Sequence, residues 1–400
     1  MVGESMLQGR PGGTGTIVEV RDAEGLRALV PDWEALAADA AEPNPFYEHW
    51  MLLPALRAFG EGESFRCLVA WQDGTLAALL PMRLERRFHG MPLPVLRSWA
   101  HRNMLHCMPL VRAKFASKVA TALLHSRLAQ VLEFDWVPND GAFFGALVEA
   151  VLAGGTPWMV TDAYMRPALV RGRDPRDKFN SNTRNNLRRS EARLRAHGEI
   201  APVRLRPGDA LQPWTEEFMR LEASGWKGRA GTAIGCREDD RQFFAEVFAE
   251  AHRRGRLAIT GLDLGGRPLA RHVMIDAGEG SFSMKLAYDE AHAAASPGML
   301  AEVDNVRQFM EGDGPRWIDS NTARESQGYG RVWKDARTVQ RIAVGIRPAG
   351  ALAVTLLPLM RLAKHWMRAL GARRPRGTQG KSGDAERAPQ SGRNDARQPA

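Results

Sequence analysis

The chain has 400 residues, 44% hydrophobic and 25% charged, which is long enough for two or three globular domains with full cores. Its three cysteines (Cys67, Cys107 and Cys236) are far apart and form no Cys-x-x-Cys pair, which argues against a disulfide scaffold or a zinc site and favours a reducing cytoplasm. The formal net charge of +9 favours an anionic partner: a phosphorylated cofactor, nucleic acid or a membrane surface.

Both ends of the chain are poor in large apolar residues. Residues 1–15 lack the apolar core that a secretory signal needs, and we expect them to be disordered. Residues 371–400 carry seven Arg or Lys against three Asp or Glu, so we expect a disordered basic tail there. The folded part is therefore expected to lie between these segments.

The first half, residues 16–172, is expected to form one domain of alternating helices and strands. Asp73-Gly74 stands between two apolar runs and predicts a hairpin. Apolar periodicity predicts helices over 33–38, 46–59, 114–125 and 143–152, and strands over 65–71, 76–84, 131–136 and 159–171. This alternation indicates an α/β layer fold.

The second half, residues 173–346, is expected to form another domain with a three-stranded antiparallel meander. Ser181 or Thr183 is the expected cap of its first helix, and Asp239 or Asp240 the expected cap of its third. The predicted helices cover 183–196, 214–224, 239–254 and 299–310, and the predicted strands cover 257–264, 268–275, 281–288 and 316–319. Both halves contain a helix, strand, glycine turn and strand in that order, which suggests two related tandem domains, although two similar hairpins arise equally well by chance.

The segment Ser296-Pro297-Gly298-Met299 opens the helix that follows the meander. Ser296 is a preferred N-cap residue, and Pro297 suits the first helical position because it has no amide hydrogen to leave unpaired. Free amides and the positive end of the helix dipole make such a start a natural anion site, so these four residues are the expected cofactor-binding group. An ordinary loop-to-helix entry explains the same residues equally well.

Alternation along the strand before this helix predicts which side chains share a face. Ser283, Lys285 and Asp289 are expected on one face and Tyr288 on the other, so Lys285 and Asp289 would face one cleft. Asp319 ends the neighbouring short strand, close to the helix start. Lys285, Asp289 and Asp319 are therefore the candidate catalytic residues, although each alone is more often a surface residue.

Two further segments contain candidate substrate-binding residues. Trp226 and Lys227 stand in a glycine-bearing loop suited to a substrate lid, although a tryptophan covering the core edge is equally consistent. Arg184 and Arg188 lie along one side of a predicted helix, where a phosphate contact competes with an ordinary solvated cationic face. No metal-binding spacing, Gly-x-Ser-x-Gly elbow, Walker loop or dinucleotide fingerprint is present, which disfavours metalloenzyme, hydrolase, kinase and dehydrogenase classes.

Several of these segments together resemble a known enzyme family. They are Ser181-Asn182-Thr183-Arg184-Asn185-Asn186-Leu187-Arg188-Arg189 with Gly198; Trp226-Lys227 with Gly231; Gly255-Arg256-Leu257 and Gly266-Arg267-Pro268-Leu269-Ala270; Lys285-Leu286-Ala287-Tyr288-Asp289; Ser296-Pro297-Gly298-Met299-Leu300; Trp317-Ile318-Asp319; and Tyr329 four residues before Trp333. The pattern resembles the GNAT-related acyltransferase family that includes CelD-like proteins of cellulose and exopolysaccharide gene clusters. That family is similar to the FemABX peptidoglycan aminoacyltransferases.

The resemblance implies two tandem GNAT-like domains with mixed, largely antiparallel sheets. It implies an acyl-CoA donor such as acetyl-CoA, no metal, and an amine of a sugar, polysaccharide precursor or other small molecule as acceptor. Asp319 or Asp289 would accept the proton of the amine, Lys285, Trp226, Lys227 and Tyr288 would orient the acceptor, and Ser296, Gly298 and Met299 would hold the phosphate of the donor.

One departure from the family pattern keeps two alternatives open. The usual Gln/Arg-x-x-Gly-x-Gly pyrophosphate loop is absent, and Ser296-Pro297-Gly298 occupies its place. A FemABX-like transferase that uses aminoacyl-tRNA is the first alternative, and only in that case would nucleic acid be a partner. A non-catalytic scaffold of exopolysaccharide synthesis is the second.

Residues 347–370 are expected to form an amphipathic helix. Their uninterrupted apolar run, 349–360, is shorter than the roughly 20 residues that a membrane-spanning helix needs. The mixture of basic and apolar residues suits either a helix docked on the domain or one at an anionic membrane surface. We therefore expect a cytoplasmic protein, with peripheral contact at the inner face of the membrane as the alternative.

Overall fold

The computed structural model describes residues 16–60, 64–324 and 328–372. The segment 1–15 and nearly all of the basic tail, both expected to be disordered, lie outside these residues. The chain divides into two compact units, one ending at Thr355 and one starting at Leu356. The domain boundary expected near residue 172 remains a prediction.

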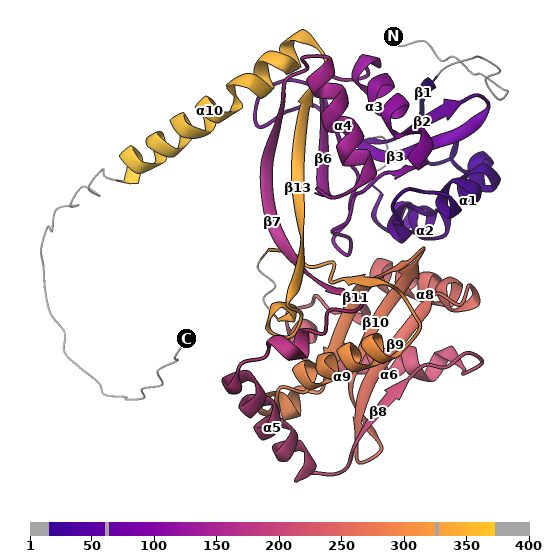
Figure 1. Cartoon of the computed structure of the whole chain (residues 1–400), viewed down its shortest axis with the longest axis vertical. Helices are drawn as coiled ribbons and strands as arrows, with labels where there is room; N and C mark the ends of the chain where they lie inside the picture. Colours follow the sequence, from indigo (N-terminus) through magenta and orange to yellow (C-terminus); the bar gives the residue numbers. More distant parts are fainter. Residues whose placement is uncertain (1–15, 61–63, 325–327, 373–400) are drawn as a thin grey trace, which may run out of the picture. The chain divides into compact units, whose positions relative to one another are not determined.

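A mixed sheet of thirteen strands runs through the first unit, and most neighbouring strands are antiparallel (Figure 1). Its order is β1-β2-β3-β4-β6-β13-β7-β12-β11-β10-β9-β8, with β5 beside β3. The strands are β1 (Thr16–Arg21), β2 (Phe65–Gln72), β3 (Thr75–Glu85), β4 (Val95–Ser98), β5 (Leu110–Val111), β6 (Val131–Pro138), β7 (Trp158–Val170), β8 (Ile200–Arg204), β9 (Leu257–Leu264), β10 (Arg267–Ala277), β11 (Gly280–Tyr288), β12 (Trp317–Asp319) and β13 (Asp335–Gly345). The predicted α/β class with a largely antiparallel sheet and flanking helices is confirmed.

Helices cover both faces of this sheet, and most of them coincide with the predicted apolar stripes. They are α1 (Val30–Ala38), α2 (His49–Phe59), α3 (Ala116–His125), α4 (Ala142–Ala153), α5 (Ser181–Arg195), α6 (Leu211–Ser224), α7 (Trp226–Arg229), α8 (Glu238–Arg253), α9 (Pro297–Glu311) and α10 (Pro348–Ala372). In the second half, Val273 and Ile275 of β10 join the cluster that contains α6 and α8, whereas Met274 joins the cluster that contains α9. The second half is therefore a sheet between two helical layers.

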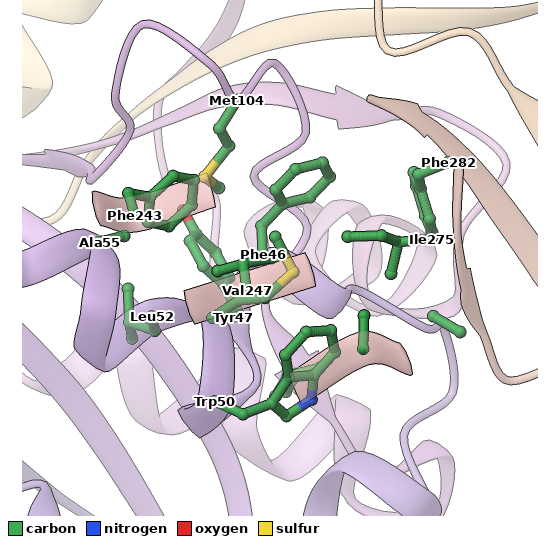
Figure 2. Packing of buried hydrophobic residues seen from close by; sticks show 14 of the residues in the cluster. Phe46, Tyr47, Trp50, Leu52, Ala55, Met104, Phe243, Val247, Ile275 and Phe282 are labelled. Carbon is green, nitrogen blue, oxygen red and sulfur yellow. The ribbon is translucent and has the colours of Figure 1, made fainter. Parts of the chain in front are cut away.

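An aromatic cluster joins elements that are far apart in the sequence. Phe46 lies edge-on to Phe282 of β11, with ring centroids 5.8 Å apart. Figure 2 shows these two rings in the same buried group as Trp50 of α2 and Phe243 of α8. The first and second halves thus share one hydrophobic core, whose burial contributes roughly 25 cal/mol per Å² of apolar area.

Strand β13 was not predicted from the sequence, yet it occupies a central place in the sheet. It pairs antiparallel with β6 on one side and with β7 on the other. Its alternation is obscured by Arg337 and Arg341, which read as surface residues in the sequence. In the structure these arginines form ion pairs with Asp140 and Asp135, respectively.

Two of the predicted helix caps are wrong by a few residues. Asn180 caps α5, because its Oδ1 accepts the amide of Thr183 at 2.8 Å, and neither Ser181 nor Thr183 acts as the cap. The N-cap of α8 is Arg237, which places Asp239 and Asp240 in the first turn. In the first turn the negative charges of Asp239 and Asp240 still stabilise α8, because they interact favourably with the positive end of the helix dipole.

Candidate active site

Strands β11 and β12 separate immediately after they meet. They pair in parallel at three positions only, ending with Phe282 opposite Asp319. Because β12 stops at Asp319, no strand of the described residues lies beside the rest of β11 on that side. The chain then passes through a short 3-10 helix, Glu290–Ala295, into the start of α9.

A cavity of about 250 Å³, here called the α9-entry cavity, lies where β11 meets the start of α9. It is lined by Leu286, Tyr288, Ala293, Ser296, Gly298, Met299, Glu302, Gly328, Tyr329, Arg331 and Val332. Three of the four expected cofactor-binding residues therefore line one cavity, together with the predicted substrate residue Tyr288. The fourth, Pro297, is buried and is not among the lining residues.

The start of α9 differs in detail from the expected anion cradle. Ser296 is the N-cap residue, but it adopts the left-handed conformation (φ 48°, ψ 54°) and its side chain makes no capping hydrogen bond. Its carbonyl oxygen accepts the amides of Met299 at 3.0 Å and Leu300 at 3.2 Å. Within the described residues, Gly298 is the one first-turn position with an amide that has no recorded acceptor, so the cradle is smaller than predicted.

Gly298 makes room for a side chain of the protein itself. A Cβ atom at this position would lie 3.0 Å from Cδ1 of Tyr288 and 3.5 Å from Cδ2 of Leu286. The glycine thus lets the Tyr288 ring lie against the first turn of α9, whereas the sequence suggested space for a ligand. Tyr288 forms a wall of the cavity for this reason.

A chain of buried hydrogen-bonding groups, here called the Tyr329 relay, reaches the wall of this cavity. The Tyr329 hydroxyl lies 2.9 Å from Oγ of Ser283, and Ser283 Oγ lies 2.8 Å from Nε2 of His272. Nδ1 of His272 and Oε1 of Glu302 lie 2.8 Å apart as an ion-pair contact without hydrogen-bond geometry. The other carboxylate oxygen of Glu302 accepts the indole N–H of Trp333 at 3.0 Å. Tyr329 and Glu302 line the cavity, so the relay begins and ends there.

The relay is buried, and it holds the Tyr329 hydroxyl in its protonated form at the cavity wall. Ser283, His272 and Glu302 are each at most 3% exposed. Burial raises the pKa of Tyr329 well above its usual value of 10.0, so its hydroxyl keeps its proton at neutral pH. Sequence reasoning missed His272 and Glu302. Glu302 could have been found, because it is a carboxylate on the apolar side of α9, among Met299, Val303 and Val306.

The predicted grouping of Ser283 with Lys285 is wrong. The register between β10 and β11 shifts between Val273, opposite Lys285, and Met274, opposite Ser283. The unpaired residue, Met284, is a β-bulge that reverses the alternation. Ser283 therefore faces the α9 side with His272, whereas Lys285 faces α6.

On the α6 side, two lysines share one buried carboxylate. Glu222 lies 3.2 Å from Nζ of Lys227 and 3.5 Å from Nζ of Lys285. Burial lowers the pKa of Lys285 below 10.5, even though Glu222 opposes this shift. Lys227 also donates to the carbonyl of Leu286 at 3.4 Å, while the side chain of Trp226 lies outside what the structure describes.

The remaining predicted residues lie apart from the α9-entry cavity. The carboxylate of Asp289 accepts the amide of Ala291 at 2.9 Å and caps the short 3-10 helix. Arg184 and Arg188 are exposed on α5 and are not among the lining residues. The structure therefore brings neither Asp289 nor these arginines to the cavity.

Asp319 is enclosed in the protein interior. It is fully buried, and its Oδ1 lies 3.3 Å from Nη1 of the equally buried Arg166 and accepts the amide of Asn321 at 2.7 Å. Burial alone would raise its pKa, but the positive charge of Arg166 outweighs this and holds the pKa below 3.8. An ionised carboxylate that is enclosed and paired with Arg166 through Oδ1 is a poor proton acceptor for a substrate. The structure does not place Asp319 beside Ser296–Met299 as expected.

A second cavity, of about 220 Å³, lies at the start of α4 and contains a perturbed carboxyl group. Glu42 lines it, and burial raises the pKa of Glu42 from 4.5 to about 7. His106 also lines it, and burial lowers the pKa of His106 to about 3, so its imidazole is neutral. In the folded protein, Glu42 and His106 are therefore both uncharged at mildly acidic pH.

We expect Glu42→Gln to remove a pH-dependent part of the stability. In the folded protein Glu42 holds a proton between pH 4.5 and about 7 that the unfolded chain has lost. The free energy of unfolding of the wild type, relative to the variant, should therefore fall by on the order of 2 kcal/mol as pH rises across this window, and then level off. Urea unfolding at a series of pH values measures this difference. Glu149→Gln, at an exposed position of α4, is the matched control, and parallel curves for Glu42→Gln and wild type would contradict the prediction.

Two structural searches were negative for the described part of the chain. Its His, Cys, Asp and Glu residues form no group of three or more placed to hold a metal ion. Among residues 16–372, apart from the undescribed gaps, no helix combines the length and apolar character needed to cross a bilayer.

Comparison with known proteins identifies the segment that contains the α9-entry cavity. Residues 181–331 match the family described as "Acetyltransferase (GNAT) domain". This segment, which is less than half of the chain, is therefore similar to GNAT acetyltransferase domains. No protein of curated function matches the chain. The CelD-like assignment thus stays a prediction.

Solved structures of similar arrangement have low sequence identity. "Crystal structure of FemX" has 11% identity and a TM-score of 0.49, covering 78% of this chain and 95% of that chain. "The structure of L-PGS from Bacillus licheniformis" has 14% identity and a TM-score of 0.48, with coverages of 86% and 97%. A tandem GNAT protein from the clavulanic acid biosynthesis pathway has 14% identity and a TM-score of 0.40, with coverages of 83% and 99%. Since every one of these TM-scores is below 0.5, they carry no functional assignment.

Proposed function

We propose that the protein is an N-acyltransferase that moves an acyl group, such as acetyl, from acyl-CoA to an amine of a sugar, polysaccharide precursor or other small acceptor. The observation that carries the proposal is the α9-entry cavity, where a helix start and a buried tyrosine relay meet. The GNAT match over residues 181–331 supports the reaction type. The motif resemblance supports the acceptor class.

The cavity offers anion-binding groups suited to a phosphorylated donor. The free amide of Gly298 and the positive end of the α9 dipole attract a phosphate oxygen. Arg331 is exposed and lines the same cavity, so its guanidinium can pair with a second oxygen. Leu286 and Met299 provide apolar walls for the rest of the carrier.

The exposed part of β11 is where the acyl group would lie. The strand has no β12 partner beyond Phe282, so backbone groups there, apart from the Leu286 carbonyl that accepts Lys227, can contact a thioester. An amine that attacks the carbonyl carbon forms a C–N bond, and the C–S bond then breaks. The departing thiolate takes the proton of Tyr329, and the resulting tyrosinate takes the proton that the attacking amine loses, so Tyr329 ends the cycle protonated. Ser283, His272 and Glu302 hold Tyr329 in place.

A transferase that uses aminoacyl-tRNA is the second candidate, because α5 offers a cationic face. This helix carries five arginines against one glutamate, and most of these side chains are exposed. Such a face suits a phosphate backbone, and binding through it would weaken steeply as salt rises. A non-catalytic scaffold is the third reading and predicts no affinity for either donor.

We expect Arg331→Ala to weaken acetyl-CoA binding about tenfold, because it removes a charged contact worth roughly 1.5–3 kcal/mol. Calorimetric titration of the full chain with acetyl-CoA, CoA and a tRNA pool measures this. Arg267→Ala is the matched control, since Arg267 is exposed and is not among the cavity-lining residues.

The three readings give different titrations. Saturable binding of acetyl-CoA that depends on Arg331 supports the proposal. Salt-sensitive tRNA binding without CoA binding supports the second candidate. Absence of binding to acetyl-CoA, CoA and tRNA would favour the non-catalytic scaffold and would overturn the proposed enzyme activity.

A further inference from the structure

The C-terminal helix α10 presents large apolar side chains to solvent. Leu359 is 62% exposed and Trp366 is 60% exposed. The exposed large apolar side chains among those described on α10, here called the apolar stripe, are Leu352, Leu356, Leu359, Met360, Leu362, Trp366 and Met367. Single exposed apolar residues are common on protein surfaces, but a cluster of this size marks an interaction site.

These residues form one continuous face of the helix. Members of the stripe recur at spacings of three and four residues, as in 352, 356, 359 and 366, which keeps them on one side at 3.6 residues per turn. The buried residues of the described part of α10, Gly350, Ala353, Val354 and Leu357, lie on a different side. The stripe is therefore not the surface through which α10 is buried.

The sequence has cationic residues at α10 positions that lie away from the stripe. Arg361, Lys364 and Arg368 follow Leu357 at intervals of four, seven and eleven residues, so they continue the side on which Leu357 lies. Between residues 347 and 383 the sequence contains eight Arg or Lys and no Asp or Glu. The helix thus combines a wide apolar face with a net positive charge in its sequence.

We propose that α10 lies flat on an anionic lipid surface. The apolar stripe enters the boundary between headgroups and acyl chains, and the cations of the opposite face and of the following segment attract the anionic headgroups. The charge argues against a second copy of this chain as the occupant, because pairing two such helices would bring like charges together. Burying the apolar stripe contributes binding energy that a purely electrostatic contact lacks.

The test measures co-sedimentation of the full chain with vesicles of phosphatidylcholine alone and of phosphatidylcholine mixed with phosphatidylglycerol. We expect binding to the mixed vesicles only, decreasing as salt is raised. Leu359→Glu with Trp366→Glu should lower the partition coefficient at least tenfold, because two charges then face the acyl boundary.

A matched variant separates this effect from a simple change of charge. Leu152→Glu with Met165→Glu introduces the same two charges at side chains that are 66% and 63% exposed on α4 and β7. This control should bind the mixed vesicles like the wild type. Far-ultraviolet circular dichroism and a melting curve show that both double variants are folded.

Two results would overturn the proposal. One is equal binding of the wild type and the Leu359→Glu, Trp366→Glu variant to mixed vesicles. The other is absence of vesicle binding together with a concentration-dependent dimer, seen by sedimentation velocity, that the same variant abolishes. The proposal does not depend on acyl transfer, because neither readout involves a donor.

Discussion

Tyr329→Phe should lower the turnover of acyl transfer at least tenfold and leave acetyl-CoA affinity nearly unchanged. The substitution removes one oxygen, and with it the proton that the departing thiolate needs and the 2.9 Å contact with Ser283. A positioned proton donor contributes roughly 10²–10⁴-fold to a rate. Release of free thiol from acetyl-CoA, measured with a panel of amine acceptors, gives the turnover, and calorimetry gives the affinity.

Tyr164→Phe is the control for this experiment. Its hydroxyl donates to the carbonyl of Thr322 at 2.9 Å, so the variant also loses a hydrogen bond, but Tyr164 does not line the α9-entry cavity. Wild-type turnover in both variants would remove the Tyr329 relay from the mechanism. Equal losses in both would mean that the effect is a general one on the fold.

Asp319→Asn should destabilise the protein by about 3 kcal/mol, because the buried charge of Arg166 would lose its counter-ion. Equilibrium urea unfolding measures the change. Since the folded-state pKa of Asp319 is below 3.8, its contribution is present at neutral pH and is lost as pH falls through that region.

An exposed ion pair is the comparison for this prediction. Arg57 and Glu246 are both about half exposed, so Glu246→Gln should cost no more than about 1 kcal/mol. Replacing both buried partners, with Arg166→Met and Asp319→Leu, should recover much of the stability, because no unpaired charge then remains. A stable Asp319→Asn protein that has lost activity would restore the role predicted from the sequence.

The local parts of the fold follow from local sequence signals. The Asp73-Gly74 hairpin is confirmed, with φ of 50° and 71°, because such a turn depends on two residues only. The start of α9 at Pro297 is also confirmed, since Pro fits the first helical position. Neither feature requires knowledge of distant residues.

The parts that were missed depend on pairing between distant segments. A β-bulge at Met284 reversed the expected face of Lys285, and no composition signal marks a bulge in that strand. The contact of His272 with Ser283 depends on the register of two neighbouring strands. The contact of His272 with Glu302 depends on a helix that lies thirty residues later in the sequence. Asp319 was chosen for its place at a strand end, which carries no information about Arg166 across the sheet.

Strand β13 makes the folding of the first half dependent on nearly the whole chain. Its residues are among the last of the first unit to be synthesised, yet they complete the sheet between β6 and β7. Until residue 345 has left the ribosome, both of those strands have an open edge that is competent for wrong pairing. Contacts between residues so far apart in the sequence slow folding. The nascent chain therefore exposes the unpaired edges of β6 and β7 for a long time, and chaperones that cover these edges would protect it from aggregation.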